Sequence, residues 1–234
     1  MKAIFKKELR SYFMTPIGYV FLAIFYFFSG FYFFAGVAAA NTSDISIVFQ
    51  SMFLIVMFLV PVLTMRMFSE EYKSKTDQLL LTSPTGLSNI VLGKYFSAML
   101  VFFFASLITV LFAIIIAVFA PVGIADFISN FVVLLLLGSC LISIGLFVSA
   151  LTKSQVVSAF GSFGIFLALM YLDTFAQFMP TGWLQNLLSD ISFMGRYRSF
   201  TSGLLNIADI LFFLSITAFF LFLTVRVLEK KRWN

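Results

Sequence analysis

Residues 95–120, YFSAMLVFFFASLITVLFAIIIAVFA, contain no charged side chain. A helix crosses the hydrocarbon core of a bilayer with about 20 predominantly apolar residues, so this stretch predicts a membrane-spanning helix. The whole chain has a matching composition, because 62% of its 234 residues are hydrophobic and 11% are charged. Soluble domains carry roughly 45–50% apolar and 25% charged residues. The sequence therefore predicts an all-α, polytopic membrane protein with one domain over residues 1–234.

Five other apolar stretches accompany this one, which gives six predicted transmembrane helices. Pro16 stands at the start of the first, where its missing N–H costs nothing. Pro61 lies inside the second and predicts a kink. The six predicted spans cover residues 17–40, 47–65, 95–120, 127–151, 156–172 and 209–227.

Basic residues set the expected orientation. Lys and Arg mark the cytoplasmic side, and in a six-span arrangement all of the 15 Lys and Arg residues except Arg196 and Arg198 fall on one side. We therefore expect both termini in the cytoplasm. The first span also imitates a cleavable signal peptide that ends in the small residues 37–40, VAAA. Its apolar run is longer than the roughly 7–15 residues of a signal core, so an uncleaved span is the preferred interpretation.

Residues 2–14 predict a short basic amphipathic helix that lies in the headgroup layer. The apolar Phe5 and Leu9 share one helical face, whereas Lys6, Lys7 and Arg10 point elsewhere. A plain basic targeting tail is the alternative interpretation.

The segment 173–208, before the last span, is too polar to cross the bilayer and too apolar for an ordinary loop. Trp183, Leu184, Leu187 and Leu188 recur in it at helical spacing. Non-helical backbone at membrane depth is tolerated only where protein or water covers it. The segment therefore predicts re-entrant outer helices, and a helix resting on the outer surface is the alternative.

Small residues fall on single faces of two predicted spans. They are Gly138, Gly145 and Ser149 in the fourth span and Gly161, Gly164 and Ala168 in the fifth. Small side chains let neighbouring membrane helices approach closely. We interpret these faces as packing surfaces.

Residues 66–94 form a charged loop between the second and third spans. Its first part, RMFSEEYKSKTDQLLLTSP (residues 66–84), runs through about two helical turns and ends in three leucines. Glu70 and Glu71 suit the positive end of a helix dipole. Leucines exposed to water indicate an interface. A solvated connector whose leucines rest on lipid is the alternative.

The pattern R-x-F-x-E-E-x-x-x-x-T-x-x-x-L-L-x-x-P in this loop, followed by Gly93-Lys94, resembles the coupling loop of type-2 ABC exporter permeases. Residues 5–9 (FKKEL), 15–20 (TPIGYV) and 228–232 (LEKKR) extend the resemblance over nearly the whole chain. The bacterial gliding-motility-type permeases are most similar, and those of copper-enzyme maturation are less so. Relatives usually have Gly-Thr where this chain has Lys75-Thr76.

The resemblance implies a permease of the bacterial plasma membrane, surrounded by lipid, that works with two cytoplasmic ATPase subunits and a second permease copy, identical or related. ATP and Mg would be bound by the ATPases, so this chain would hold no cofactor and no metal, and nucleic acid would not be a partner. Substrate would pass between the two permeases. The implied ATPase-docking residues are Glu70, Glu71, Thr76, Leu79, Leu80 and Pro84.

Other function classes need residues that the sequence lacks. The chain has no G-x-x-x-x-G-K-[ST] phosphate loop, so it cannot hydrolyse ATP itself. It has no His and one Cys, Cys140, which excludes His-ligated haem, His/Cys zinc sites and an internal disulfide. An intramembrane enzyme would need a nucleophile–base pair or a metal cluster. The alternative function, an ion-coupled secondary transporter, needs ionisable groups at membrane depth, and the predicted spans carry none away from their ends.

Overall fold

The computed structural model describes residues 1–40, 42–76, 78, 86–121, 123–178, 182, 190–201 and 206–233. Every regular element in these ranges is helical, which confirms the all-α prediction for them. In chain order the elements are α1 (Lys2–Met14), α2 (Pro16–Phe33), the π-helix η1 (Phe34–Ala38), α3 (Ser46–Thr64), α4 (Ser69–Ser74), α6 (Leu87–Ser106), α7 (Ile108–Phe119), α8 (Ile124–Leu151), α9 (Gln155–Phe178), α11 (Phe193–Thr201) and α12 (Ile207–Trp233).

The described chain contains six helical stretches that are long and apolar enough to cross a membrane, as the sequence predicts. They are Pro16–Ala38, Ser46–Ser74, Leu87–Phe119, Ile124–Leu151, Gln155–Leu172 and Ile207–Arg232. The third begins at Leu87, and Leu107 separates its two helices, α6 and α7. The sequence prediction placed this boundary just after Lys94. The helix itself begins earlier, so that Lys94 lies inside α6, where protein covers it.

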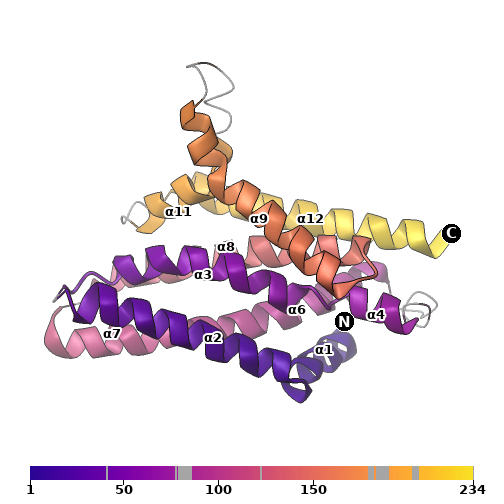
Figure 1. Cartoon of the computed structure of the whole chain (residues 1–234), viewed down its shortest axis with the longest axis horizontal. Helices are drawn as coiled ribbons and strands as arrows, with labels where there is room; N and C mark the ends of the chain where they lie inside the picture. Colours follow the sequence, from indigo (N-terminus) through magenta and orange to yellow (C-terminus); the bar gives the residue numbers. More distant parts are fainter. Residues whose placement is uncertain are drawn as a thin grey trace.

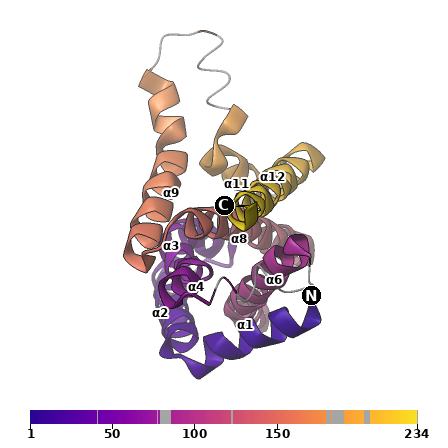
Figure 2. The same cartoon turned by 90° about the vertical axis from the view of Figure 1, so that its right-hand side faces the viewer.

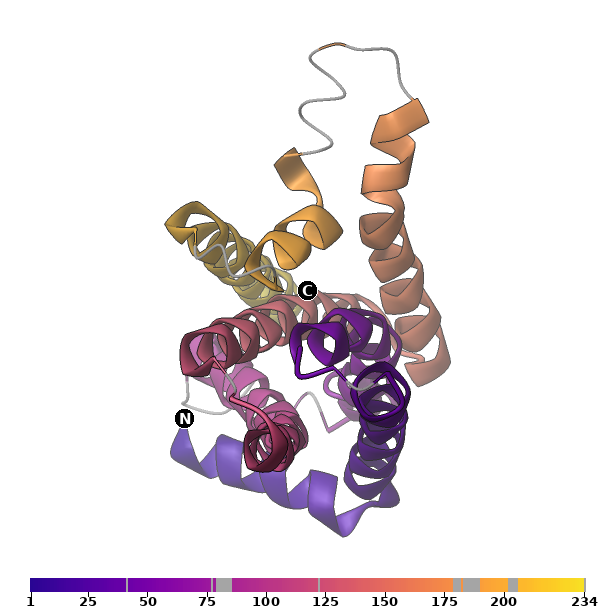
Figure 3. The same cartoon turned by 90° about the vertical axis from the view of Figure 1, so that its left-hand side faces the viewer.

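The helix α8 lies at the centre of the bundle, where it packs against α3, α6, α9, α11 and α12. In Figure 1 most of the long helices run along the long axis, and α1, α4 and both termini lie toward the same end. Figure 2, seen from that end, shows α1 crossing the ends of α2 and α6, which it contacts. Figure 3, from the opposite end, shows α9 extending away from the bundle.

Burial divides the spans into inner and outer helices. Of the most apolar stretch of each span, 72% is buried in α8, whereas 17% is buried in α9 and in α12. The outer helices expose large apolar side chains, among them Phe27, Phe160 and Phe222. Apolar side chains on a membrane span can face lipid or another apolar helix, so the exposure of these side chains is compatible with a position in the bilayer.

The predicted close packing is confirmed for the fourth span. A Cβ atom built on Gly138 would lie 2.1 Å from a ring carbon of Phe102 on α6. A Cβ atom on Gly145 would lie 2.2 Å from the hydroxyl oxygen of Thr64 on α3. In the fifth span, by contrast, a Cβ atom on Gly164 would meet nothing within 4 Å. The small residues of α8 therefore let α3 and α6 pack closely against it. The small residue Gly164 of α9 has no such neighbour.

Part of the expected outer segment is folded as α11. The Tyr197 hydroxyl donates a hydrogen bond of 2.7 Å to the carbonyl oxygen of Phe49 on α3. Arg196 forms an ion pair with Asp209 at the start of α12. Trp183, Leu184, Leu187 and Leu188 lie outside the described residues. Re-entrant or interfacial placement of these residues stays a prediction.

Candidate functional site

The N-terminus of α4 is capped from another helix. A turn over residues 65–68 leads from α3 into α4. The hydroxyl oxygen of Ser149, on α8, accepts hydrogen bonds from the N–H groups of Phe68 (3.0 Å) and Ser69 (3.2 Å). The first N–H groups of a helix have no partner within the helix. Ser149 therefore supplies partners that α4 cannot supply itself.

The C-terminus of α4 ends at Lys75 in a left-handed backbone conformation, with φ at 56°. A residue with a Cβ atom pays about 1–2 kcal/mol for this conformation. Glycine adopts it freely and is the usual residue where a helix ends in this way. The Gly that similar permeases usually have here is therefore explained by backbone geometry.

The ammonium group of Lys94 is the centre of a charge cluster between α1, α4 and α6. The Lys94 side chain is 1% exposed, and its Nζ lies 3.0 Å from Glu8 Oε1 on α1 and 2.9 Å from Glu71 Oε1 on α4. It also donates a hydrogen bond of 2.6 Å to the carbonyl oxygen of Met67, in the turn before α4. An ammonium group has three N–H donors, and these three contacts match them. Lys94 thereby ties α6 to two other helices and to the turn.

Lys7 adds a second cation to the same two carboxylates. Its Nζ lies 3.2 Å from Glu71 Oε1 and 3.8 Å from Glu8 Oε1. Partial burial disfavours the charged form of Lys7, but the nearby carboxylates of Glu71 and Glu8 outweigh this effect and raise the pKa of Lys7 above its ordinary value. Two ammonium groups thus face two carboxylates, and the cluster is electrically balanced.

Arg66, in the turn before α4, forms a second link between α4 and the end of α1. Its Nε donates to Glu70 Oε2 at 2.7 Å, and its Nη1 donates to the Thr15 hydroxyl at 2.8 Å, between α1 and α2. Its Nη2 lies 3.4 Å from the Ser11 hydroxyl of α1. The α1 helix is also held by Tyr12, whose buried hydroxyl donates to the Leu63 carbonyl oxygen at 2.9 Å.

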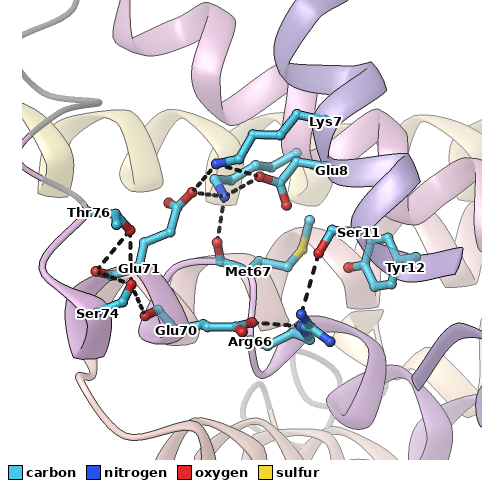
Figure 4. A pocket seen from close by; sticks show the side chains of 11 residues that line it. Lys7, Glu8, Ser11, Tyr12, Arg66, Met67, Glu70, Glu71, Ser74 and Thr76 are labelled. Atoms are coloured by element: carbon cyan, nitrogen blue, oxygen red, sulfur yellow. Dashed lines mark hydrogen bonds and ion pairs between the residues drawn. The ribbon is translucent and has the colours of Figure 1, made fainter. Parts of the chain in front are cut away.

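A polar cavity of about 290 Å³ lies between these groups. It is lined by the charged residues of both links, together with Ser11, Tyr12, Ser74 and Thr76 (Figure 4). The positive and negative side chains that line it face one another in pairs. The cavity is therefore a polar joint between helices, with no excess charge of either sign to attract a free ion.

The C-terminal helix contacts α4 as well. Nζ of Lys231, on α12, lies 3.7 Å from the centre of the Tyr72 ring and donates a hydrogen bond of 2.7 Å to the carbonyl oxygen of Ala150, at the end of α8. A lysine over an aromatic face is attracted by the ring electrons. Side chains from α1, α6, α8 and α12 therefore converge on a helix of six residues.

The three described residues among those assigned to ATPase docking differ in exposure. Glu71 is buried and faces Lys94, whereas Glu70 is about half exposed and Thr76 is exposed. Leu79, Leu80 and Pro84 lie outside the described residues. Their contact with an ATPase stays a prediction, and the inward position of Glu71 assigns it an additional role inside the permease.

The residues assigned to the N-terminal helix divide between two faces of α1. Lys6, Lys7 and Arg10 are exposed, and Phe5 and Leu9 are partly buried. Leu9 packs against the core of the protein. Placement of α1 in the headgroup layer stays a prediction, but its apolar face is covered largely by protein.

The sequence interpretation missed contacts of three residues. Glu8 is the lone acid among the Lys and Arg residues of α1, which was the available signal for an internal ion pair. Lys94 follows Gly93 in an otherwise apolar stretch, and this position resembles a membrane boundary unless its partners are known. Ser149 was predicted as a packing residue and is also a helix cap.

The described residues contain no group of three or more His, Cys, Asp or Glu side chains that could hold a metal ion. The contacts described above are ion pairs and hydrogen bonds between helices. Such an arrangement can position helices and transmit force, whereas it offers no nucleophile–base pair for covalent chemistry.

Six helices that are long and apolar enough to cross a membrane define the class of multi-pass membrane proteins. The family model for ABC-2 family transporter protein matches residues 2–234, and the chain belongs to this family. It is accordingly a membrane permease that pairs with an ATPase subunit. A comparison with curated proteins gave no match.

Proposed function

We propose that this chain is the permease subunit of an ATP-driven exporter in the bacterial plasma membrane. Two copies, or this chain and a related one, surround the substrate path, and two cytoplasmic ATPases bind their α1 and 66–94 regions. The motion of the ATPases reaches the membrane helices through the charged loop. The gliding-motility-type permeases are the group that this proposal favours.

One observation carries the proposal: α4 is small and polar, yet four other helices hold it through side-chain contacts. A loop that only connected two spans would need none of these contacts. Loops usually run over the surface and tolerate change, because few interactions fix them. An element that receives force from a partner, in contrast, must be firmly attached to the helices that it moves.

The alternative is a secondary transporter that needs no ATPase. It would require an ionisable group that binds and releases a proton or ion at membrane depth. Lys94 is buried in the third span, but it is paired with Glu8 and Glu71 at the end of the bundle that carries α1 and α4. Transport by vesicles that contain only this chain and a proton gradient would favour the alternative.

The docking surface is tested with the ATPase encoded beside the gene of this chain. Replacing Leu79 and Leu80 by Ser, or the exposed Lys6 and Arg10 by Glu, should leave membrane insertion intact and reduce co-purification of the ATPase. Stimulation of ATP hydrolysis by the permease should fall in parallel. Lys153→Glu is the matched control, because Lys153 is an exposed basic residue outside both regions. Normal capture and stimulation by both variants would show that the ATPase binds elsewhere.

The expected topology is tested by cysteine labelling. Single cysteines at Trp183 and Leu187, in a background without Cys140, should react with a membrane-impermeant thiol reagent added outside intact cells. A cysteine at Lys73, on α4, should react only after the membrane is opened. The opposite pattern would invert the topology and remove the basis for cytoplasmic docking.

A further inference from the structure

The geometry points to Lys94 as a positioning residue that joins α1, α4 and α6 into one rigid unit, so that force applied to α4 moves α1 and the third span together. This inference rests on the proposed function for the origin of the force. It changes the expected role of Glu71, which holds α4 to the membrane helices from inside while the exposed side of α4 is left for the ATPase. The direct link bypasses the loop between α4 and α6.

The three elements are close enough for one side chain to hold them. A Cβ atom built on Gly93 would lie 3.1 Å from Ile4 Cγ2 and 3.4 Å from the backbone nitrogen of Phe5, so α1 crosses α6 directly at this position. The next residue of α6 is Lys94, which reaches Glu8 on one side and Glu71 on the other. The glycine thus brings α1 against the helix, and the lysine connects it to α4.

The chemistry of the link explains why a lysine suits this position. The carboxylates of Glu8 and Glu71 both lie within 3.0 Å of the same ammonium nitrogen, and two carboxylates this near each other would repel without a cation. Lys7 also faces both, but its side chain is 60% exposed, so water competes for it. The Lys94 side chain is 1% exposed, so water competes far less for its ammonium group while α4 is in place.

Each carboxylate therefore fixes a different helix to α6. Removing the Glu71 charge breaks the ionic link of α4 to α6 but keeps that of α1 through Glu8, and removing the Glu8 charge does the reverse. Removing Lys94 breaks both links, while the Ser149 contact of α4 and the Tyr12 contact of α1 remain. Removing one partner of a buried ion pair is strongly unfavourable and should raise the population of the separated arrangement on the order of 100-fold. A residue that merely stabilised the fold would not produce this arm-specific pattern.

The test measures distances within the full chain in lipid nanodiscs. Spin labels are attached to cysteines that replace the exposed residues Lys6 on α1, Lys73 on α4 and Asn89 on α6, after Cys140→Ala. Pulsed electron–electron double resonance spectroscopy then gives the distribution of distances between the labels on α1 and α6 and between those on α4 and α6. In the background chain both distributions should be narrow. Glu71→Gln should broaden only the α4–α6 distribution, and Glu8→Gln only the α1–α6 distribution.

Lys94→Met should broaden both distributions, and Lys94→Arg should restore both in part because it keeps the charge. Lys153→Met, which removes an exposed charge outside the cluster, should change neither. Equal helix content and a single size-exclusion peak identify variants that remain folded. If Lys94→Met does not fold, the two Glu→Gln variants decide the question alone. Unchanged distributions in the Glu→Gln variants would overturn the rigid unit.

The inference and the proposed function can fail separately. The distance measurements use the permease alone, so they report on the rigid unit whether or not an ATPase binds. In the assembled transporter, Lys94→Arg should retain the ATPase and its stimulation, while Lys94→Met should retain the ATPase and lose stimulation of ATP hydrolysis. Arm-specific broadening without any captured ATPase would keep the rigid unit and overturn the proposed function.

Discussion

Replacing Ser149 by Ala should release the N-terminus of α4 from α8. The Ser149 hydroxyl accepts the N–H groups of Phe68 and Ser69, and it donates to the Met65 carbonyl oxygen at 3.2 Å. Leaving a buried donor unsatisfied costs about 1–3 kcal/mol. Because α4 lies at the end of the bundle, where water can replace part of this loss, we take about 2 kcal/mol for the pair. That value corresponds to an approximately 30-fold increase in the open population of α4.

Hydrogen–deuterium exchange of the chain in nanodiscs measures this population. Peptides that cover residues 66–76 should exchange about 30-fold faster in Ser149→Ala, while peptides from the centre of α8 should be unchanged. Ser143→Ala is the matched control. Ser143 is also fully buried on α8, but its hydroxyl donates only to Cys140, one turn earlier on the same helix.

The control variant should therefore leave the exchange of α4 at its original rate. Equal exchange of residues 66–76 in the original chain and in both variants would refute the reasoning, since α4 would then not depend on the Ser149 cap. Equal acceleration in both variants would assign the effect to general loosening of α8. Only acceleration confined to Ser149→Ala supports a cap that acts between helices.

Three further predictions concern single positions. Lys75→Gly should slow exchange of α4, because removing the left-handed strain contributes about 1 kcal/mol. Gly138→Leu should destabilise the bundle by about 1–3 kcal/mol or more through its clash with Phe102, measured as a lower thermal midpoint, and Phe102→Ala should relieve part of this loss in the double variant. Lys7→Met should lower the thermal midpoint at neutral pH. Because the folded pKa of Lys7 is raised above 10.5, this difference should persist up to that pH and shrink as the pH rises through the folded value.

The number and order of the spans could be predicted because a helix in lipid satisfies its backbone internally and needs apolar side chains along its length. The same reasoning failed at Lys94. Hydropathy treats an unpaired lysine as a mark of the membrane edge, and it cannot show that Glu8 lies 86 residues away in the chain but 3.0 Å away in space. The helix that contains the third span therefore begins earlier than the apolar pattern suggests.

The candidate site was predicted as a surface and is partly an interior. Adjacent residues on a helix point in different directions, about 100° apart, but the sequence gave no indication that Glu71 rather than Glu70 faces the interior. Which of the two carboxylates faces the interior depends on where α4 lies against α1 and α6. That position is set by contacts such as the hydrogen bond between Ser149 and Phe68. The backbone at Lys75 could have been predicted locally. Similar permeases usually have Gly at this position, and Gly is the usual residue for the left-handed conformation that Lys75 adopts.

If the proposed function holds, the contacts of α4 also limit how a movement of the ATPase can be transmitted to the membrane helices. Ser149 joins α4 to α8, Lys94 joins it to α6, and Lys231 bridges it to the end of α8 from α12. Moreover, α6 and α8 meet at Gly138 without room for a methyl group. A force on α4 cannot shift one of these helices alone without separating a buried ion pair or opening a packed interface. Collective movement of α4, α6, α8 and α12 is therefore the least costly response. This group can slide more easily along the exposed faces of the outer helices, where no buried ion pair has to separate.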